Sequence, residues 1–91
     1  MRSLIWRPSA LRQLAEIAGY IAERDRSAAE RLQSRIHESV GKIQVLPEGG
    51  RPGRVPKTRE WIAHPNYILI YKVSPKAITI LRVLHARQRY P

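Results

Sequence analysis

The chain has 91 residues, a hydrophobic fraction of 43% and no cysteine. This composition predicts one folded domain over residues 1–91 with a single modest core, and it excludes disulfides and thiolate chemistry. No apolar run approaches the ~20 residues of a membrane-spanning helix, and no signal-peptide pattern begins the chain. We therefore expect a cytoplasmic protein with no membrane partner.

Charge is the strongest signal in the composition. Seventeen Lys and Arg residues oppose seven acidic residues, for a formal net charge of +10. Residues 47–91 carry nine basic and two acidic side chains, against eight and five in residues 1–46. Most of the cations are Arg, whose planar guanidinium suits phosphate and carboxylate groups. This asymmetry predicts a polyanionic or acidic partner, and the alternative is a basic surface with no specific ligand.

The first half of the chain predicts one strand followed by a helical hairpin. Residues 2–6 are β-prone, and Arg7-Pro8 after them marks a boundary. Apolar residues then recur at spacings of three and four, which predicts a helix from about Ser9 to Arg24. Ser27 and Glu30 fit a capping box that opens a second helix, and its apolar stripe continues to Leu46. Both helices are amphipathic, so each needs a sheet to pack upon.

The second half predicts a loop and three strands. Residues 48–56 are rich in glycine and proline, so we expect an ordered connection without a long regular element. Strands are predicted at Thr58–His64, at Tyr67–Val73 and from about Ala77, and the short turns between them favour an antiparallel meander. The predicted fold class is α+β, with the order β-α-α-β-β-β and the helical hairpin on one face of the sheet. The sequence does not specify the edge at which the first strand joins.

Alternation along the strands predicts which side chains share a face. Residues 67, 69, 71 and 73 should lie on one face, with 68, 70 and 72 on the other. If the last strand is regular, Leu81, Val83, His85 and Arg87 share a face, opposite Ile78, Ile80, Arg82 and Leu84.

The end of the last strand gathers candidate reactive groups. His85, Arg87, Arg89 and Tyr90 fall within six positions, and Arg59 could come within reach across the sheet. Such a set could cleave RNA without a metal, since His85 suits acid or base work and Arg54, Arg59 and Arg87 could hold phosphate. Tyr90 could stack on a base or donate a proton. The alternative is a strand end whose polar groups are solvated or paired.

Other candidate sites carry weaker signals. Arg51, Arg54 and Lys57 make the glycine-rich loop a candidate anion site, although it lacks phosphate-loop spacing. His37 has no histidine, cysteine or acidic partner at ligand spacing, so we expect a solvated side chain and neither a metal site nor a cofactor.

The order of elements, together with five stretches of sequence, resembles the RelE/ParE superfamily of bacterial toxin–antitoxin toxins. These stretches are LIWRPSALRQLAEIAGYIAER, GRPGR, TRE, YILIYKV and ILRVLHARQRYP, and the resemblance covers nearly the whole chain. It implies a toxin that inhibits growth until a cognate antitoxin neutralises it, with operator DNA bound only through the antitoxin complex. Antitoxins of this kind often bind over the helical hairpin and sheet face, which makes Leu14, Ile17 and Ile21 the candidate contact residues.

The superfamily has two branches with different targets. RelE-like members cut mRNA in the ribosomal A site, whereas ParE-like members poison DNA gyrase. Several nuclease-type members carry Arg after the first tyrosine of the YILIYKV-type strand, where this sequence has Ile68, and the Arg82–His85 segment looks more like the ParE branch.

The resemblance therefore favours a ParE-like gyrase poison. The alternative is a RelE-like, metal-independent endoribonuclease that depends on the ribosome, and an attenuated toxin or a simple nucleic-acid-binding domain is a third hypothesis. Catalytic residues in the RelE-like case would be His85, Arg87, Arg59 and Tyr90. Residues expected to bind the target or nucleic acid are Arg51, Arg54, Lys57, Arg82 and Arg89.

Overall fold

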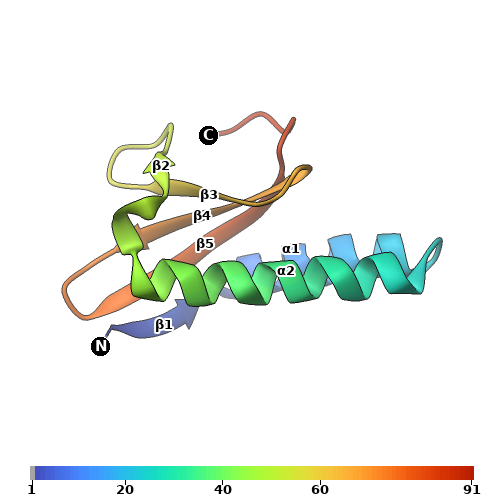
Figure 1. Ribbon diagram of the computed structural model, residues 1–91. Coiled ribbons are helices and arrows are strands. Elements are labelled where there is room, and N and C mark those ends of the chain that lie inside the picture. The colour runs from blue at the N-terminus through green and yellow to red at the C-terminus, as the bar shows by residue number, and fades with distance from the viewer. Residues whose placement is uncertain (1) are drawn as a thin grey trace.

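The computed structural model describes residues 2–91, which form two helices on one face of a five-stranded sheet. The chain order is β1 (Ser3–Trp6), α1 (Pro8–Ala22), α2 (Arg26–Val45), the 3-10 turn η1 (Pro47–Gly49), β2 (Arg51–Pro52), β3 (Arg59–His64), β4 (Tyr67–Val73) and β5 (Ala77–His85). The strand order in the sheet is β1-β5-β4-β3-β2. Figure 1 shows the helices on one side of the strands and the C-terminal segment on the other.

The predicted α+β class and the helical hairpin on the sheet are confirmed. Two features are additional. β1 lies at the edge and pairs in parallel with β5, while the other neighbouring strands pair antiparallel. A two-residue strand, β2, pairs with the start of β3 inside the segment that was predicted to be only a loop.

The second helix begins two residues earlier than a cap on Ser27 requires. Asp25 is the N-cap residue, with extended backbone, and its carboxylate accepts a hydrogen bond of 3.1 Å from the amide of Ala28. This satisfies one of the amides that a helix leaves without an intrahelical partner. The capping box predicted for Ser27 and Glu30 was wrong, because Asp25 already supplies the acceptor and Ser27 lies inside the helix.

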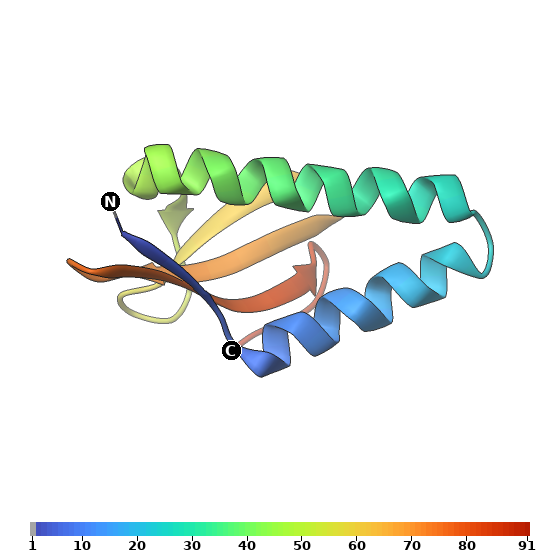
Figure 2. The same cartoon turned by 90° about the horizontal axis from the view of Figure 1, so that it is seen from below.

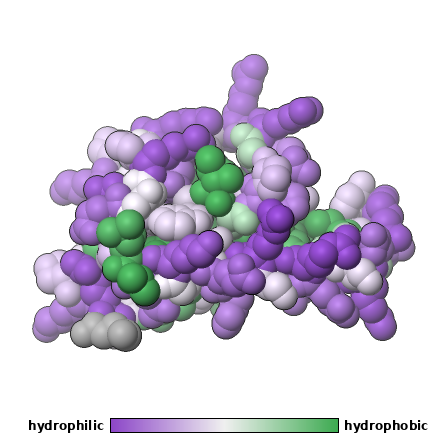
Figure 3. All heavy atoms as spheres, in the orientation of Figure 1, coloured by the Kyte–Doolittle hydropathy of each residue, from purple (hydrophilic) through white to green (hydrophobic). Residues whose placement is uncertain are grey.

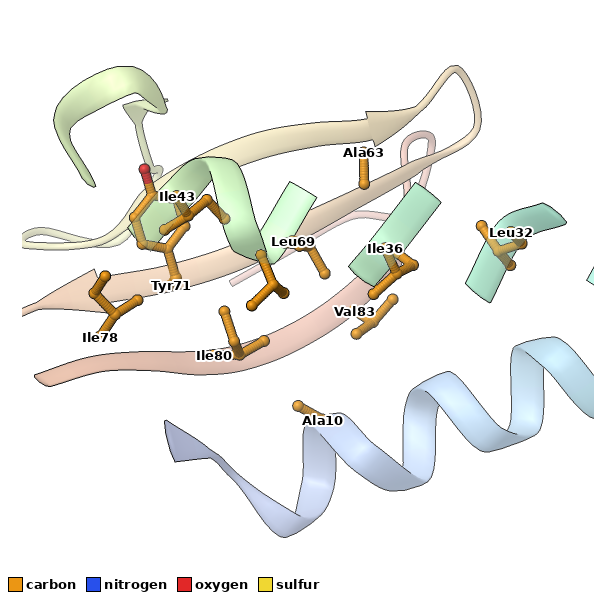
Figure 4. Packing of buried hydrophobic residues seen from close by; sticks show 11 residues of the cluster. Ala10, Leu32, Ile36, Ile43, Ala63, Leu69, Tyr71, Ile78, Ile80 and Val83 are labelled. Carbon is orange, nitrogen blue, oxygen red and sulfur yellow. The ribbon is translucent and has the colours of Figure 1, made fainter. Parts of the chain in front are cut away.

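The main core lies between the helices and the sheet. Figure 4 shows side chains from both helices meeting those of β4 and β5 in one layer. Leu69 and Tyr71 belong to this core, while Ile68 and Ile70 belong to a second cluster on the opposite face of the sheet. The predicted alternation in β4 is therefore confirmed. The buried members of the main core are Ala10, Leu32, Ile36, Val40, Ile43, Ala63, Leu69, Tyr71, Ile78, Ile80 and Val83.

An irregularity in β5 changes which side chains share a face. Ile70 pairs with Arg82, but the next residue of β4, Tyr71, pairs with Ile80, so β5 has one extra residue at this point. Ile80 and Val83 both lie in the main core as a result. The condition of a regular last strand is therefore not met, because strict alternation would have placed these two side chains on opposite faces.

The helical hairpin extends past the sheet. Figure 2 shows α1 and α2 joined by a turn that lies beyond the ends of the strands, and residues 22–27 are all exposed. Within residues 2–91, neither helix is long and apolar enough to cross a membrane.

Candidate functional site

His85 lies at the end of β5, in a cavity between the sheet and α1. Its ring meets the ring of Tyr67 edge-on, with the centroids 5.3 Å apart. The Nδ1 atom of His85 accepts a hydrogen bond of 3.1 Å from the backbone amide of Arg87. In the neutral imidazole the proton is therefore on Nε2. The cavity has a volume of about 250 Å³ and is lined by Glu16, Ile17, Tyr20, Tyr67, His85 and Gln88.

A second histidine, which the sequence did not single out, lies near the same tyrosine. The His64 ring centroid is 5.6 Å from that of Tyr67, and His64 Nδ1 accepts a 3.0 Å hydrogen bond from the amide of Asn66. Burial lowers the pKa of His64, and the positive charge of Arg35 lowers this pKa further. His64 and His85 each end a strand, and in each the Nδ1 atom accepts a hydrogen bond from the backbone amide two residues later. The sequence shows both strand ends, but the spacing of the two histidines does not show that both rings contact Tyr67.

Arg59 lies away from His85. Its guanidinium donates to the backbone carbonyls of Gly50 at 2.8 Å and Glu48 at 3.2 Å, so it holds the segment after α2. Arg59 pairs with Tyr71 on β4, whereas His85 pairs with Tyr67. Four residues of strand separate these positions, or roughly 13 Å. The prediction that Arg59 comes within reach of His85 was wrong, because the strands pair at opposite ends of β4.

Tyr90 lies on the other face of the sheet. It is 6% exposed and belongs to the second cluster, with Ile68, Ile70 and Leu84. The C-terminal segment turns back over this face, as Figure 1 shows. Within residues 2–91, the Tyr90 hydroxyl has no hydrogen-bond partner. Tyr90 therefore acts as a core residue, and it shares no cavity with His85 in this structure.

The basic residues differ in how they are held. Arg51 Nε donates a 2.7 Å hydrogen bond to the carboxylate of Glu60, which is 3% exposed. Arg54 stacks over Tyr90, with its guanidinium carbon 4.6 Å from the ring centroid. Arg87 and Arg89, by contrast, are exposed in the C-terminal segment, and Arg82 is half-buried on β5.

Lys57 is exposed in an ordered turn before β3. Its φ of 69° is in the left-handed region, which costs a residue with a side chain about 1–2 kcal/mol. The turn is held by a hydrogen bond from the Thr58 hydroxyl to the Val55 carbonyl (2.6 Å) and one from the Gly53 amide to the Thr58 carbonyl (2.8 Å). Residues held in this backbone region often lie at active sites and ligand clamps, which makes Lys57 a candidate functional residue.

The helix residues expected to meet an antitoxin are half-buried. Leu14, Ile17 and Ile21 pack partly against the main core, which leaves only part of each side chain available. Figure 3 shows a mostly hydrophilic face with two separate apolar areas, one near the end of α2 and one over β3. The largest exposed apolar side chains of α1, the end of α2 and β3 are Leu11, Tyr20, Val45, Leu46 and Ile62. Leu11 belongs to the apolar spacing that predicted the first helix, yet its side chain is half exposed. Tyr20 lies outside that spacing, and Val45, Leu46 and Ile62 lie at the end of α2 or on β3.

Metal ligation has no candidate in the described part of the chain. Residues 2–91 contain no group of three or more His, Cys, Asp or Glu side chains that could hold a metal ion. His37 is exposed on α2.

Comparisons with known proteins identify the chain. The family described as "ParE toxin of type II toxin-antitoxin system, parDE" matches residues 4–90. Y4kP of Sinorhizobium fredii is 42% identical over 87 residues, which is 94% of this chain and 90% of that protein. A chain of the chromosomal ParDE TA system from P. aeruginosa has a TM-score of 0.84 and 27% identity, covering 93% of this chain and 96% of that one.

A more distant structural match shows the fold alone. A chain of the E. coli DinJ-YafQ toxin-antitoxin complex has a TM-score of 0.53 and 18% identity, covering 92% of this chain and 91% of that one. The fold and its relatives define a small toxin of the RelE/ParE superfamily. Within that superfamily, the chain belongs to the ParE toxin family of type II toxin–antitoxin systems.

Proposed function

We propose that this protein poisons DNA gyrase by binding, and that it does not cleave RNA. The observation that carries the proposal is the separation of the four candidate catalytic residues. His85 lies in the cavity beside α1, Arg59 is bound to backbone carbonyls at the other end of β4, and Tyr90 is buried on the opposite face. RNA cleavage without a metal requires an acid, a base and a cation around one phosphate. Of the three candidates other than His85, Arg87 is the nearest to it, two residues later in the chain.

The basic residues support a binding role. Arg51, Arg54 and Lys57 come from one loop region, and Arg54 links this region to the C-terminal segment through Tyr90. Arg89 immediately precedes that tyrosine and is exposed. A cationic surface of this kind suits a protein–DNA complex, where phosphate contacts position the protein. We propose that Lys57 and Arg89 contact the target, since neither has its charge committed to an ion pair within residues 2–91.

The antitoxin would neutralise the protein by covering apolar surface. We propose that it binds over the helical hairpin, where the exposed parts of Leu14, Ile17 and Ile21 adjoin the more exposed Leu11 and Tyr20. A partner that buries these side chains would be acidic, given the net charge of +10.

Gyrase assays test the proposed target. Purified protein added to gyrase and plasmid DNA should inhibit supercoiling and increase cleaved DNA, without ribosome-dependent mRNA cleavage. Lys57→Glu and Arg89→Glu should each weaken inhibition by about tenfold if each loses a phosphate contact, while Arg12→Glu on α1 is the matched charge control. The proposal is overturned if gyrase is unaffected and primer extension shows mRNA cleavage that His85→Ala abolishes.

A further inference from the structure

The cavity between α1 and the end of the sheet has the composition of a ligand site. We name it the Tyr67 pocket, and its residues are Glu16, Ile17, Tyr20, Tyr67, His85 and Gln88. At about 250 Å³ it lies just below the ~300 Å³ at which ligand sites commonly begin, so it suits a small planar group.

The walls of the Tyr67 pocket combine aromatic surface with uncommitted polar groups. Tyr67 and His85 meet edge-on, and Tyr20 is 60% exposed. Within residues 2–91, the Glu16 carboxylate has no ion pair, and neither Glu16 nor Gln88 has a side-chain hydrogen bond. Because His85 Nδ1 is occupied by the Arg87 amide, its Nε2 is left as a donor. Aromatic walls with a few free donors and acceptors are typical of sites for planar heterocycles.

Two cations adjoin residues that line the Tyr67 pocket. The guanidinium carbon of Arg24 lies 3.9 Å from the centroid of the Tyr20 ring, and Arg24 also donates a 3.0 Å hydrogen bond to the Tyr20 carbonyl. Arg87 follows His85 by two residues and is exposed. An Arg stacked on an exposed tyrosine matches the pairing of stacking surface and positive charge that binds single-stranded nucleic acid, and Arg87 adds an exposed cation two residues after His85.

We propose that the Tyr67 pocket binds an unpaired nucleobase, with the base against Tyr20 and Tyr67 and the adjoining phosphates near Arg24 and Arg87. The Glu16 carboxylate can only accept hydrogen bonds and repels phosphate, so it selects a base edge rich in N–H donors. Guanine has two such donors side by side on its Watson–Crick edge, and it is the preferred base. This binding belongs to the toxin itself and does not depend on gyrase as the target.

Oligonucleotide binding measures the proposal directly. Fluorescence anisotropy at fixed salt compares a thymine 12-mer that has one central guanine with the all-thymine 12-mer, each as DNA and as the corresponding uracil-based RNA. The guanine-containing strand should bind several-fold more tightly than the strand without guanine. A larger preference in the DNA pair would indicate that the base comes from DNA, and a larger preference in the RNA pair would indicate RNA. Tyr20→Ala should weaken binding by about tenfold, the effect of losing one stacking contact, while Val45→Ala at the exposed end of α2 should not. Glu16→Gln should remove the preference for guanine, and Glu30→Gln on α2 is the matched control.

Both test residues are exposed on α1, so the variants should fold, and circular dichroism checks this. NMR titration with GMP should shift the signals of Tyr67 and His85. The proposal is overturned if folded wild-type protein binds no strand, if the guanine preference survives Glu16→Gln, or if GMP shifts only residues elsewhere. The last two results would leave gyrase inhibition intact, so failure of this site is distinguishable from failure of the proposed target.

Discussion

Arg54 stacks on Tyr90, and this contact joins the β2–β3 loop to the C-terminal segment across the face of the sheet that the helices leave uncovered. Cation–π contacts of this kind contribute about 0.5–1 kcal/mol where they are partly exposed. The larger effect is shielding, because Tyr90 covers Ile68, Ile70 and Leu84, which are at most 3% exposed. The terminal residues therefore belong to the fold.

Substitution of Tyr90 tests this role. Tyr90→Ala should lower the free energy of unfolding by about 3 kcal/mol, since it removes a buried ring. Tyr90→Phe should be neutral or slightly stabilising, because the buried hydroxyl has no partner within residues 2–91. Urea denaturation measures both, with the exposed Gln88→Ala as the control. Equal stability of the Ala variant and the wild type would show that the segment does not hold this face.

Removal of the hydroxyl should have the opposite effect at Tyr71, where Tyr71→Phe should lower the free energy of unfolding. The Tyr71 hydroxyl donates to the Pro47 carbonyl at 2.6 Å and accepts from the Gly50 amide at 3.1 Å, both in buried surroundings. Tyr71→Phe leaves two buried backbone groups unpaired and should cost about 2–4 kcal/mol. Denaturation of Tyr71→Phe beside the exposed Tyr20→Phe separates this effect from the general one of losing a hydroxyl. A loss of stability smaller than that of the control would show that the two hydrogen bonds of the Tyr71 hydroxyl do not stabilise the fold.

The Arg51–Glu60 pair should be worth more than a surface ion pair. Arg51→Ala leaves the buried Glu60 carboxylate without its cation, and we expect a loss of about 2 kcal/mol because Arg51 itself is half-exposed. Arg31→Ala breaks a pair with Asp25 at 3.9 Å in which both side chains are exposed, and it should cost under about 0.5 kcal/mol. Chemical denaturation at pH 7 compares them. Similar losses for the two variants would mean that burial of Glu60 adds nothing.

His64 should make stability depend on pH. Because its folded pKa lies below the usual 6.5, the unfolded chain takes up the proton first as the pH falls. The stability contribution is therefore complete above about pH 6.5 and is lost as the pH falls through the folded pKa. His64→Asn should flatten the stability profile between pH 7 and 5, as measured by thermal denaturation.

The part of this shift that comes from Arg35 can be measured separately. NMR titration of His64 should give a higher pKa in Arg35→Gln than in the wild type, because one positive charge near the imidazole is removed. Arg12→Gln makes the same change in net charge on α1. An equal rise in both variants would assign the effect to net charge rather than to Arg35.

The sequence predicts the longer helices and strands well because each of them extends over several repeats of its apolar pattern. Apolar spacing indicates both helices, and the turns at Pro65 and Pro75 separate three strands whose pairing follows from short connections. The two-residue β2 could not be predicted, since such a short strand has no period and forms only because β3 offers an edge to it. The start of α2 was misplaced because Asp25 and Ser27 both suit an N-cap, and the backbone at Asp25 decides between them.

The candidate site was harder to predict because it depends on small irregularities. The extra residue in β5 keeps Ile80 and Val83 in the main core and leaves His85 on the side of α1. Simple alternation along a strand does not predict such an extra residue. Another shift between Ile62 and His64 accompanies the contact of His64 with Tyr67. Tyr90 follows the last strand, so its return across the sheet depends on apolar surface that only the assembled strands create.

The parallel pairing of β1 with β5 has a consequence during synthesis of the protein. Ser3 faces Ala77, 74 residues later in the chain, and β5 is an interior strand of the sheet. While residues 77–85 are still being made, β1 has no partner and α1 lacks the strand against which it packs. Contacts so distant in sequence are slow to form. A chain that lacks residues 77–85 should therefore not form this fold.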